Sequence, residues 1–362
     1  MCYAAVSSII ISELLIFMNI LAIESSCDET SAAVVKNGTE VLSNVIASQA
    51  MMHNATGGVV PEVAAREHVN NIIPVIDKAL AEANITLAKI DAIAVTYGPG
   101  LGVALVIGTS VANTLALIMQ KPLIPVKHIY GHVYAPWLDS KKSAQFPILS
   151  LSVSGGHNEL FLIKDHMEFQ VLGETADDAA GEAFDKVARM IGLGYPGGPV
   201  VEAAAKKGDP HAFNFPKASF SDGRLDFSFS GLKTAILYHL QKNTSRLTDK
   251  RFLADTAASF QRAVIEALSS RVFTALDTYP DIKEVHVTGG VSANSALREH
   301  IEQGLKNWNK INGKNISFRT PAKLSYCTDN AAMIGAAAYF EFQKNPTRYE
   351  TFEFVAPRAS FD

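Results

Sequence analysis

Two histidines four positions apart are the clearest candidates for metal ligands in this sequence. His128 and His132 flank the tripeptide Ile-Tyr-Gly, and if residues 126–134 are helical, both imidazoles project from one face of the helix. Their Cβ atoms would then lie about 5 to 6 Å apart, which suits two nitrogen ligands of one metal ion. The same spacing also fits a pair of ordinary surface or core histidines, so the pattern alone leaves both interpretations open.

The residue after the first histidine argues against a peptidase. Metallopeptidases of the H-E-x-x-H type carry a glutamate there, which serves as the general base. Position 129 is isoleucine instead. The histidine pair therefore predicts a metal site that lacks the base needed for peptide hydrolysis.

Asp329 is the candidate for a third ligand. It follows Cys327 and Thr328, where the sequence predicts the start of an alanine-rich helix over 330–342. A carboxylate at this position can instead cap the free N–H groups of that helix, which is the alternative interpretation. Two nitrogen ligands and one oxygen ligand would favour iron or zinc and would leave coordination positions open for a substrate.

Three glycine-containing segments in the second half of the chain favour a phosphate-bearing ligand. They are residues 152–156, Gly197-Gly198-Pro199, and Gly289-Gly290 with Asn294 close behind. Backbone amides can approach a phosphate or a carbonyl at such places because no Cβ intervenes. Tight turns explain any one of the segments, but the three together indicate a nucleotide-like ligand. Asp185, on the polar face of a helix expected over 179–191, could accept hydrogen bonds from a ribose or be solvated.

The cysteines and acid–base groups exclude other chemistry. The chain contains Cys2, Cys27 and Cys327 and no CxxC pair, which argues against a disulfide scaffold or a thiolate zinc site and favours a reducing cytoplasm. Cys27 is expected to be a packed residue, because no adjacent histidine or lysine is present to activate it. No side chain stands out as a general acid or base.

Two hairpins predict that the elements holding these residues are duplicated. A buried strand over 20–23 leads through a polar turn at 24–30 into a returning strand over 31–35. The same pattern recurs over 147–153, 154–157 and 159–163. Because each copy begins one half of the chain, we expect two α/β lobes whose polar turns face each other across a cleft.

Length and composition agree with two ordered lobes. The chain has 362 residues, of which 48% are hydrophobic and 19% charged, which excludes wholesale disorder. A net charge of −4 gives no global attraction to nucleic acid but leaves room for a local basic patch. Residues 1–17 contain no lysine or arginine and are too short to cross a membrane, so they predict neither a signal peptide nor a membrane segment. We expect them to be an extension that precedes a true start at Met18.

Taken in chain order, a series of short segments resembles one family of enzymes, the tRNA N6-adenosine threonylcarbamoyltransferases. The segments are IESSCDET at 23–30, GPGL at 98–101, HIYGH at 128–132, SGGH at 154–157, GEAFDK at 181–186, YPGGP at 195–199, SFSGLKT at 228–234, TGGVSAN at 288–294 and YCTDNAA at 326–332. The resemblance extends from Met18 to about residue 343, and the N-terminal extension is the evident departure from it. The SFSGLK segment is typical of the bacterial or organellar branch.

The resemblance implies a fold and a ligand set. The fold would be the duplicated ribonuclease-H-like α/β fold of actin, Hsp70 chaperones and sugar kinases, with lobes at 18–140 and 141–327 around a central cleft. The last helix, at about 328–345, would join the first lobe. One divalent ion, iron(II) or else zinc, would be held by His128, His132 and Asp329. Threonylcarbamoyl-adenylate would be held by Ser152, Val153, Ser154, Gly155, Gly156, Asp185, Gly198 and Asn294.

The resemblance also implies a reaction and partners. An acyltransferase of this family would move the threonylcarbamoyl group from the adenylate to N6 of the adenosine 3′ of the anticodon, in tRNAs that read codons beginning with A. Its partners would be the tRNA, a paralogous subunit of the same fold and a small P-loop ATPase, with no membrane involved. An ATPase or kinase on the same fold remains an alternative, and a metallopeptidase is disfavoured by the isoleucine at position 129.

Overall fold

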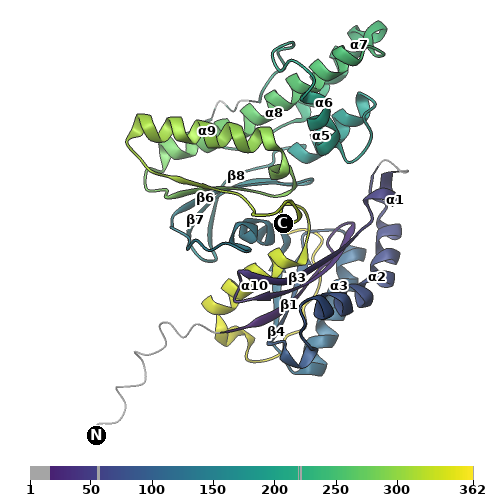
Figure 1. The fold of residues 1–362 in the computed structure, drawn as a ribbon, viewed down its shortest axis with the longest axis vertical. Coiled ribbons are helices and arrows are strands. Elements are labelled where there is room, and N and C mark those ends of the chain that lie inside the picture. The colour runs from purple at the N-terminus through teal and green to yellow at the C-terminus, as the bar shows by residue number, and fades with distance from the viewer. Residues whose placement is uncertain (1–16, 55–57, 219, 221, 362) are drawn as a thin grey trace.

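The computed structural model describes residues 17–54, 58–218, 220 and 222–361 (Figure 1). Apart from Phe17, the predicted extension at 1–17 lies outside the described residues. The expected start at Met18 therefore stays a prediction. The boundary between the lobes at 140/141 is a prediction as well. The described chain forms two sheets, each covered by helices, one above the other in Figure 1.

The first sheet has the strand order β3-β2-β1-β4-β5. Its strands are β1 (Asn19–Glu24), β2 (Glu29–Lys36), β3 (Glu40–Ser48), β4 (Ala92–Gly98) and β5 (Leu123–Lys127). The β1–β2 and β2–β3 pairs are antiparallel, whereas β4 runs parallel to both β1 and β5.

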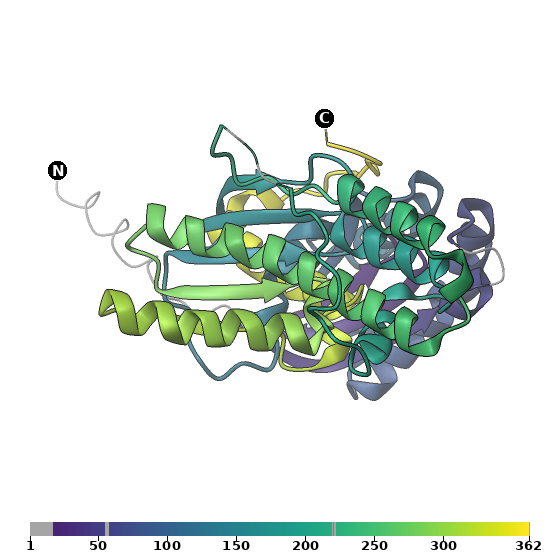
Figure 2. The ribbon, with the colours of Figure 1, turned by 90° about the horizontal axis from the view of Figure 1, so that it is seen from above.

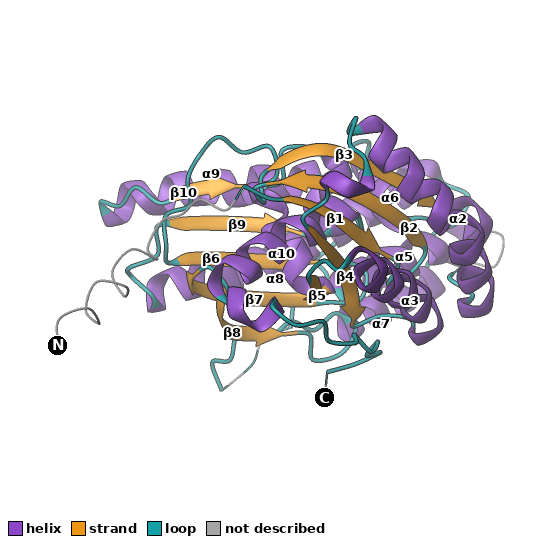
Figure 3. Ribbon diagram, turned by 90° about the horizontal axis from the view of Figure 1, so that it is seen from below, coloured by secondary structure: helices purple, strands orange, loops and turns teal. Residues whose placement is uncertain are grey.

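The second sheet repeats the first, which confirms the predicted duplication (Figure 3). Its strands are β6 (Ile148–Val153), β7 (Asn158–Asp165), β8 (Glu168–Glu174), β9 (Glu284–Thr288) and β10 (Ser317–Arg319), in the order β10-β9-β6-β7-β8. Read from the other edge, this is the order of the first sheet, with the same antiparallel and parallel pairs. The fold is the two-lobed ribonuclease-H-like α/β fold that the sequence predicts.

Helices bury both faces of the first sheet. Ile20 and Ala22 of β1 point to α4 (His128–Tyr134) and α10 (Ala331–Lys344), while Leu21 and Ile23 point to the opposite face, under α2 (Pro61–Glu82) and α3 (Gly102–Met119). Because alternate residues of a strand face opposite sides, a strand covered on both sides is apolar throughout. The last helix thus packs on the first sheet although it follows the second in sequence.

The second sheet is covered by helices on its outer face, as Figure 2 shows from above. They are α5 (Ala180–Met190), α6 (Gly197–Ala205), α7 (Ser230–Lys242), α8 (Lys250–Thr278) and α9 (Ser295–Asn312). Leu149 and Leu151 of β6 belong to the core under these helices. The other face of β6 carries Ser150 and Ser152 and lies towards α4 of the first lobe. The remaining short helices are α1 (Ala50–Asn54), η1 (Leu87–Lys89), η2 (Ala135–Trp137), η3 (Thr244–Arg246), η4 (Gly290–Ala293), η5 (Leu324–Tyr326) and η6 (Pro346–Tyr349).

Two predicted helices begin later than the sequence suggested. The helix expected over 126–134 begins at His128, because Val126 pairs with Thr96 of β4 as part of β5. The helix expected from residue 330 begins at Ala331, because Asn330 is its N-terminal cap. The first shift comes from backbone pairing with another strand, and the second from a side-chain cap within the same helix.

Among the described helices, α3 is long and apolar enough, by length and composition alone, to cross a membrane. In the structure it packs on β4 and α2, and Ala104, Leu105 and Ala112 on its inner side are buried. This arrangement is that of a core helix in a layered α/β lobe.

Two glutamates lie opposite each other on neighbouring strands of the second sheet, and they provide a test of the fold. Glu159 of β7 lies opposite Glu174 of β8, and burial, reinforced by the charge of Glu174, raises the pKa of Glu159 from 4.5 to about 7. A carboxyl group with a raised native pKa favours folding while it is protonated, so this contribution is lost as the pH rises through about 7.

We expect Glu159→Gln to stabilise the protein relative to wild type by about 1–2 kcal/mol near pH 8, after a discount for partial exposure, and to have little effect near pH 5. Urea unfolding at both pH values measures the difference. The exposed Glu353 gives a matched control in Glu353→Gln. An effect of equal size at both pH values would show that charge at this position is not the cause.

Candidate metal centre and ligand cleft

The structure brings together the three residues proposed as metal ligands. His128 and His132 lie on α4, and Asp329 lies in the turn before α10. Asp329 Oδ1 is 3.4 Å from His128 Nε2 and 3.2 Å from His132 Nε2. One ligand atom from each residue falls within 4.8 Å of the other two. The group is therefore compact enough to hold a single ion.

Asp329 is not the cap of α10. The side chain of Asn330 fills that position, since its Oδ1 accepts a hydrogen bond from Met333 N at 3.2 Å. The carboxylate of Asp329 is therefore turned towards the two histidines rather than towards the helix end. Of the two interpretations of Asp329, capping is the one that the structure contradicts.

Polar atoms of the candidate ligands that lack hydrogen-bond partners also suit a bound cation. His132 is fully buried, and neither of its ring nitrogens has a hydrogen-bond partner among the described residues, despite the nearby Asp329 oxygen. Burying an imidazole without partners is costly. A cation between the three groups would satisfy His132 and the carboxylate at once.

Glu24, which the sequence analysis did not single out, orients His128. Its Oε2 lies 3.0 Å from His128 Nδ1 and accepts from Thr96 Oγ1 at 2.5 Å, while Oε1 accepts from Ser26 N at 2.6 Å. A carboxylate bonded to one imidazole nitrogen leaves the other nitrogen available as a ligand. The signal in the sequence was a single charged residue, Glu24, directly after the apolar run Ile20–Ile23 of β1.

The electrostatics of the site favour positive charge. Burial alone would lower the pKa of His128, but Asp329 and Glu24 reverse this effect and raise it well above its usual value. Burial opposes ionisation of Glu24 as well, yet the charge and hydrogen bond of His128 hold the pKa of this carboxyl below its ordinary value. Burial raises the pKa of the Cys27 thiol, which agrees with a packed rather than a nucleophilic cysteine.

The 152–156 segment ends β6 and forms the turn at the tip of the second hairpin. Ser152 and Val153 are the last residues of the strand. The turn is fixed because Ser154 O accepts from Gly181 N at 3.2 Å, and a Cβ on Gly181 would lie 2.5 Å from that oxygen. Gly155 and Gly156 are exposed, with open space where side chains would stand. Their backbone is therefore accessible to a ligand.

Asp185 and Gly198 lie on neighbouring helices. Asp185 Oδ1 accepts from the backbone N of Gly197 at 2.7 Å, and a Cβ on Gly197 would lie 2.5 Å from Asp185 Cα. Burial raises the pKa of Asp185, although the hydrogen bond from Gly197 opposes the rise. The carboxylate is thus not simply solvated, because it holds the first turn of α6 against α5. Its contact with a ribose stays a prediction.

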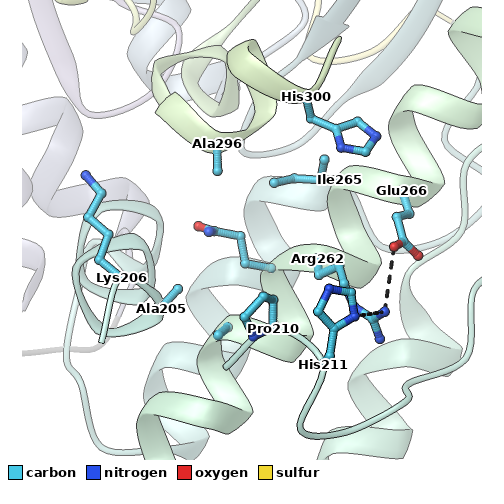
Figure 4. A pocket seen from close by; sticks show the side chains of 11 residues that line it. Ala205, Lys206, Pro210, His211, Arg262, Ile265, Glu266, Ala296 and His300 are labelled. Carbon is cyan, nitrogen blue, oxygen red and sulfur yellow. Dashed lines mark hydrogen bonds and ion pairs between the residues drawn. The ribbon is translucent and has the colours of Figure 1, made fainter. Parts of the chain in front are cut away.

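Asn294 caps α9 and is hydrogen-bonded to a residue that lines a cavity. Its Oδ1 accepts from Leu297 N at 3.0 Å, and its Nδ2 donates to Gln261 Oε1 at 2.8 Å. Gln261 lines a cavity of about 470 Å³ between α6, α8 and α9 (Figure 4). In Figure 4, Lys206, directly after α6, and Ala296 of α9 border this cavity. Side chains of α6, α8 and α9 thus line one cavity. Gly198 lies on α6, Gln261 lies on α8, and Asn294 directly precedes α9.

Comparison with known proteins identifies the family of this chain. The family model of the tRNA N6-adenosine threonylcarbamoyltransferases matches residues 40–336. The enzyme of that name from Clostridium botulinum (strain 657 / Type Ba4) is 53% identical over 327 residues, 90% of this chain and 93% of the relative. The enzyme of the same name from Clostridium beijerinckii is 51% identical over 326 residues, with the same coverage of both chains.

The solved structures support the fold. Full-length HypF in its phosphate- and nucleotide-bound form superposes with a TM-score of 0.58 over 91% of this chain and 47% of that chain, at 12% identity. At this identity the likeness concerns the fold alone. The family model and the close relatives show the family: this chain belongs to the tRNA N6-adenosine threonylcarbamoyltransferase family.

Proposed function

We propose that this chain transfers a threonylcarbamoyl group from threonylcarbamoyl-adenylate to N6 of the adenosine 3′ of the anticodon, in tRNAs that read codons beginning with A. Membership of the family supports the reaction. The observation that carries the proposal is the compact group of His128, His132 and Asp329 on α4 and before α10, with β6 packed against α4.

The three ligands would hold one divalent ion. Two imidazoles and one carboxylate form the set that favours iron(II), with zinc as the alternative. When bound, the ion supplies Lewis acidity and a template for the carbonyl group of the substrate. Glu24 would keep His128 in the orientation that presents Nε2 to the ion, through the 3.0 Å contact with Nδ1.

The second lobe would hold the donor. The exposed turn at Gly155 and Gly156 would receive the carbonyl or phosphate oxygens on backbone amides. The N-terminus of α6 at Gly198 and the carboxylate of Asp185 would face the ribose phosphate portion, in keeping with the affinity of helix N-termini for anions. The purine would extend past Asn294 into the cavity of about 470 Å³.

In the reaction, N6 of the acceptor adenosine forms a bond to the carbamoyl carbon and releases one of its protons to water. The bond from that carbon to the phosphate oxygen breaks, and AMP leaves with the electron pair. Backbone amides of the 154–156 turn would stabilise the charge that develops on oxygen. We assign no side chain as general base. Since AMP is a good leaving group, positioning of donor and acceptor would supply much of the rate.

The outer side of α2 and α3 would bind the paralogous subunit. Ile73 of α2 is 53% exposed, and Leu117 and Ile118 of α3 are 60% and 75% exposed. Adjacent helices with exposed aliphatic side chains form the kind of apolar patch that marks a protein interface. A subunit with the same lobe would present equivalent helices to this patch. The small P-loop ATPase, the tRNA and a cytoplasmic location complete the proposal.

Removal of a ligand tests the metal. We expect Asp329→Ala and His132→Ala to lose bound metal and at least about 100-fold in transfer, because the remaining ligands cannot hold the ion. Metal content is measured by mass spectrometry. Transfer is measured with the partner proteins, unmodified tRNA, labelled threonine, bicarbonate and ATP.

Asp281→Ala, at an exposed aspartate, is the control and should match wild type. Full transfer by a metal-free variant would refute the role of the ion. Vigorous ATP hydrolysis by this chain alone, with no label in tRNA, would instead support an ATPase or kinase.

Filling the cavity between α6, α8 and α9 tests the donor site. Ala296→Trp should raise the KM for threonylcarbamoyl-adenylate about 10-fold or more, because the indole occupies the space assigned to the purine. Metal content should not change. Gln303→Trp, at an exposed position of the same helix, serves as the control. An unchanged KM in Ala296→Trp would place the purine elsewhere.

A charge in the apolar patch tests the partner surface. Leu117→Asp should weaken association with the paralogous subunit at least about 10-fold, since the carboxylate would be buried without a partner. Analytical ultracentrifugation of the mixture measures association. Lys121→Asp, on the chain just beyond α3, is the charge control. Equal association of Leu117→Asp and wild type would exclude this surface.

A further inference from the structure

A second cavity, of about 560 Å³, lies beside the candidate metal centre and takes no part in the proposed donor site. Its walls come from segments far apart in the chain: Pro99 and Gly100 before α3, residues around the start of α4, the first residues of β7 and the C-terminal Ala359–Phe361. None of its lining residues belongs to α6, α8 or α9. The cavity is therefore separate from the space assigned to the purine and adjoins the donor site only at the 154–157 turn.

The cavity is adjacent to the proposed metal ligands. Ile129 and Tyr130, which line it, directly follow His128 on α4, and His157, which also lines it, ends the turn assigned to the donor. Gly100 also lies close to a neighbour of His128, because a Cβ on Gly100 would lie 2.5 Å from Ser26 O, and Ser26 Oγ lies 3.1 Å from His128 Nδ1. A group bound here would lie beside the candidate metal ligands.

The C-terminal segment is tied to the first lobe by hydrogen bonds. Val355 exchanges two hydrogen bonds of 2.9 Å with the side chain of Asn113 on α3. Arg358 N donates to Tyr97 O at 2.7 Å, and Ala359 O accepts from Gly100 N at 3.1 Å. A Cβ on Gly98 would collide with the carbonyl of Arg358. The segment is thus a fixed wall of the cavity, and in Figure 1 the C-terminal end lies between the two lobes.

The side chains of this wall suit an aromatic base next to a phosphate. The ammonium of Lys127 lies 4.5 Å from the ring centre of Phe361 and 5.5 Å from that of Tyr130, so it sits between two aromatic rings. Tyr130 is backed by Phe169 at 4.3 Å, and Phe361 meets Tyr97 edge-on at 5.2 Å. None of the ion pairs between described side chains involves Lys127. Its charge acts on Glu159, which lines the same cavity, and partly offsets the rise in the pKa of that carboxyl.

We propose that this cavity receives the acceptor adenine of the tRNA, with Phe361 and Tyr130 as stacking surfaces and Lys127 turned to a neighbouring phosphate. The proposal rests on the proposed function. Enzymes that act on a base within a nucleic acid take it out of the stack into a pocket, and aromatic rings beside cations are how proteins bind unstacked bases. Donor and acceptor would then approach the metal centre from different sides.

Substitution of Phe361 tests this binding site for the acceptor adenine. Phe361→Ala should raise the KM for tRNA about 10-fold, within the range for loss of one stacking partner, and leave metal content and affinity for threonylcarbamoyl-adenylate unchanged. Phe361→Trp should restore the wild-type KM. Phe354→Ala, the same change at a side chain that is 72% exposed on the same segment, should behave as wild type.

A binding probe separates this proposal from the proposed function. An anticodon stem–loop RNA with 2-aminopurine in place of the acceptor adenosine lacks N6 and cannot react, but its fluorescence falls when the base stacks on a ring. We expect the protein with its partners to quench the probe, and Phe361→Ala to lose most of the quenching while Phe354→Ala retains it.

Equal quenching and equal KM for wild type and Phe361→Ala would overturn the proposal that this cavity binds the acceptor adenine, even if transfer to tRNA is robust. A parallel loss of metal or donor affinity in Phe361→Ala would also overturn it, because the role would then be structural. Failure of wild type to modify tRNA counts against the proposed function, whereas the quenching alone decides where the base binds.

Discussion

The candidate centre depends on the close approach of α4 to α10. A Cβ on Gly131 would lie 2.6 Å from Ile334 Cδ1, and a Cβ on Gly335 would lie 2.7 Å from Val35 Cγ2. Glycine at both positions lets α10 lie between α4 and the first sheet without a gap. Because of this contact, the turn before α10 delivers Asp329 to two histidines that lie some two hundred positions earlier in the chain. Larger side chains at either glycine would separate the ligands.

Duplication supplies the second requirement, two equivalent hairpin turns that have diverged in use. In the first copy the turn is buried: Ser26 is 2% exposed and contacts His128, and Glu24 at the end of β1 does the same. In the second copy the turn carries the exposed Gly155 and Gly156 at the end of β6. One turn thus positions a candidate metal ligand inside the lobe, whereas the other leaves its backbone exposed.

The sequence predicted what local patterns encode and missed what distant contacts decide. The hairpins, the long helices and the ligand candidates follow from periodicity and residue type. The cap at Asn330 and the start of α4 depend on competition between neighbouring hydrogen bonds, so they were misplaced by one or two residues. The role of Glu24 depends on partners about seventy and one hundred positions away. The C-terminal wall has no periodicity at all, and only the fold places Phe361 beside Lys127.

Glu24 also helps to explain the charge of the centre. A buried carboxylate is costly unless it is paired. Apart from Asn19, the other residues of β1 are aliphatic, so the strand itself would be equally well formed with an apolar residue at position 24. The glutamate is therefore explained by its partners in the centre. Glu29, close by, does not add to the negative charge, because burial and the neighbouring Asp329 and Asp28 raise its pKa to about 9 and keep it protonated. Glu24 and Asp329 would offset the charge of a divalent ion held here, and the neighbouring Asp28 adds a further negative charge. Ionisation of Glu29 as well would add more negative charge beside the proposed position of the anionic adenylate.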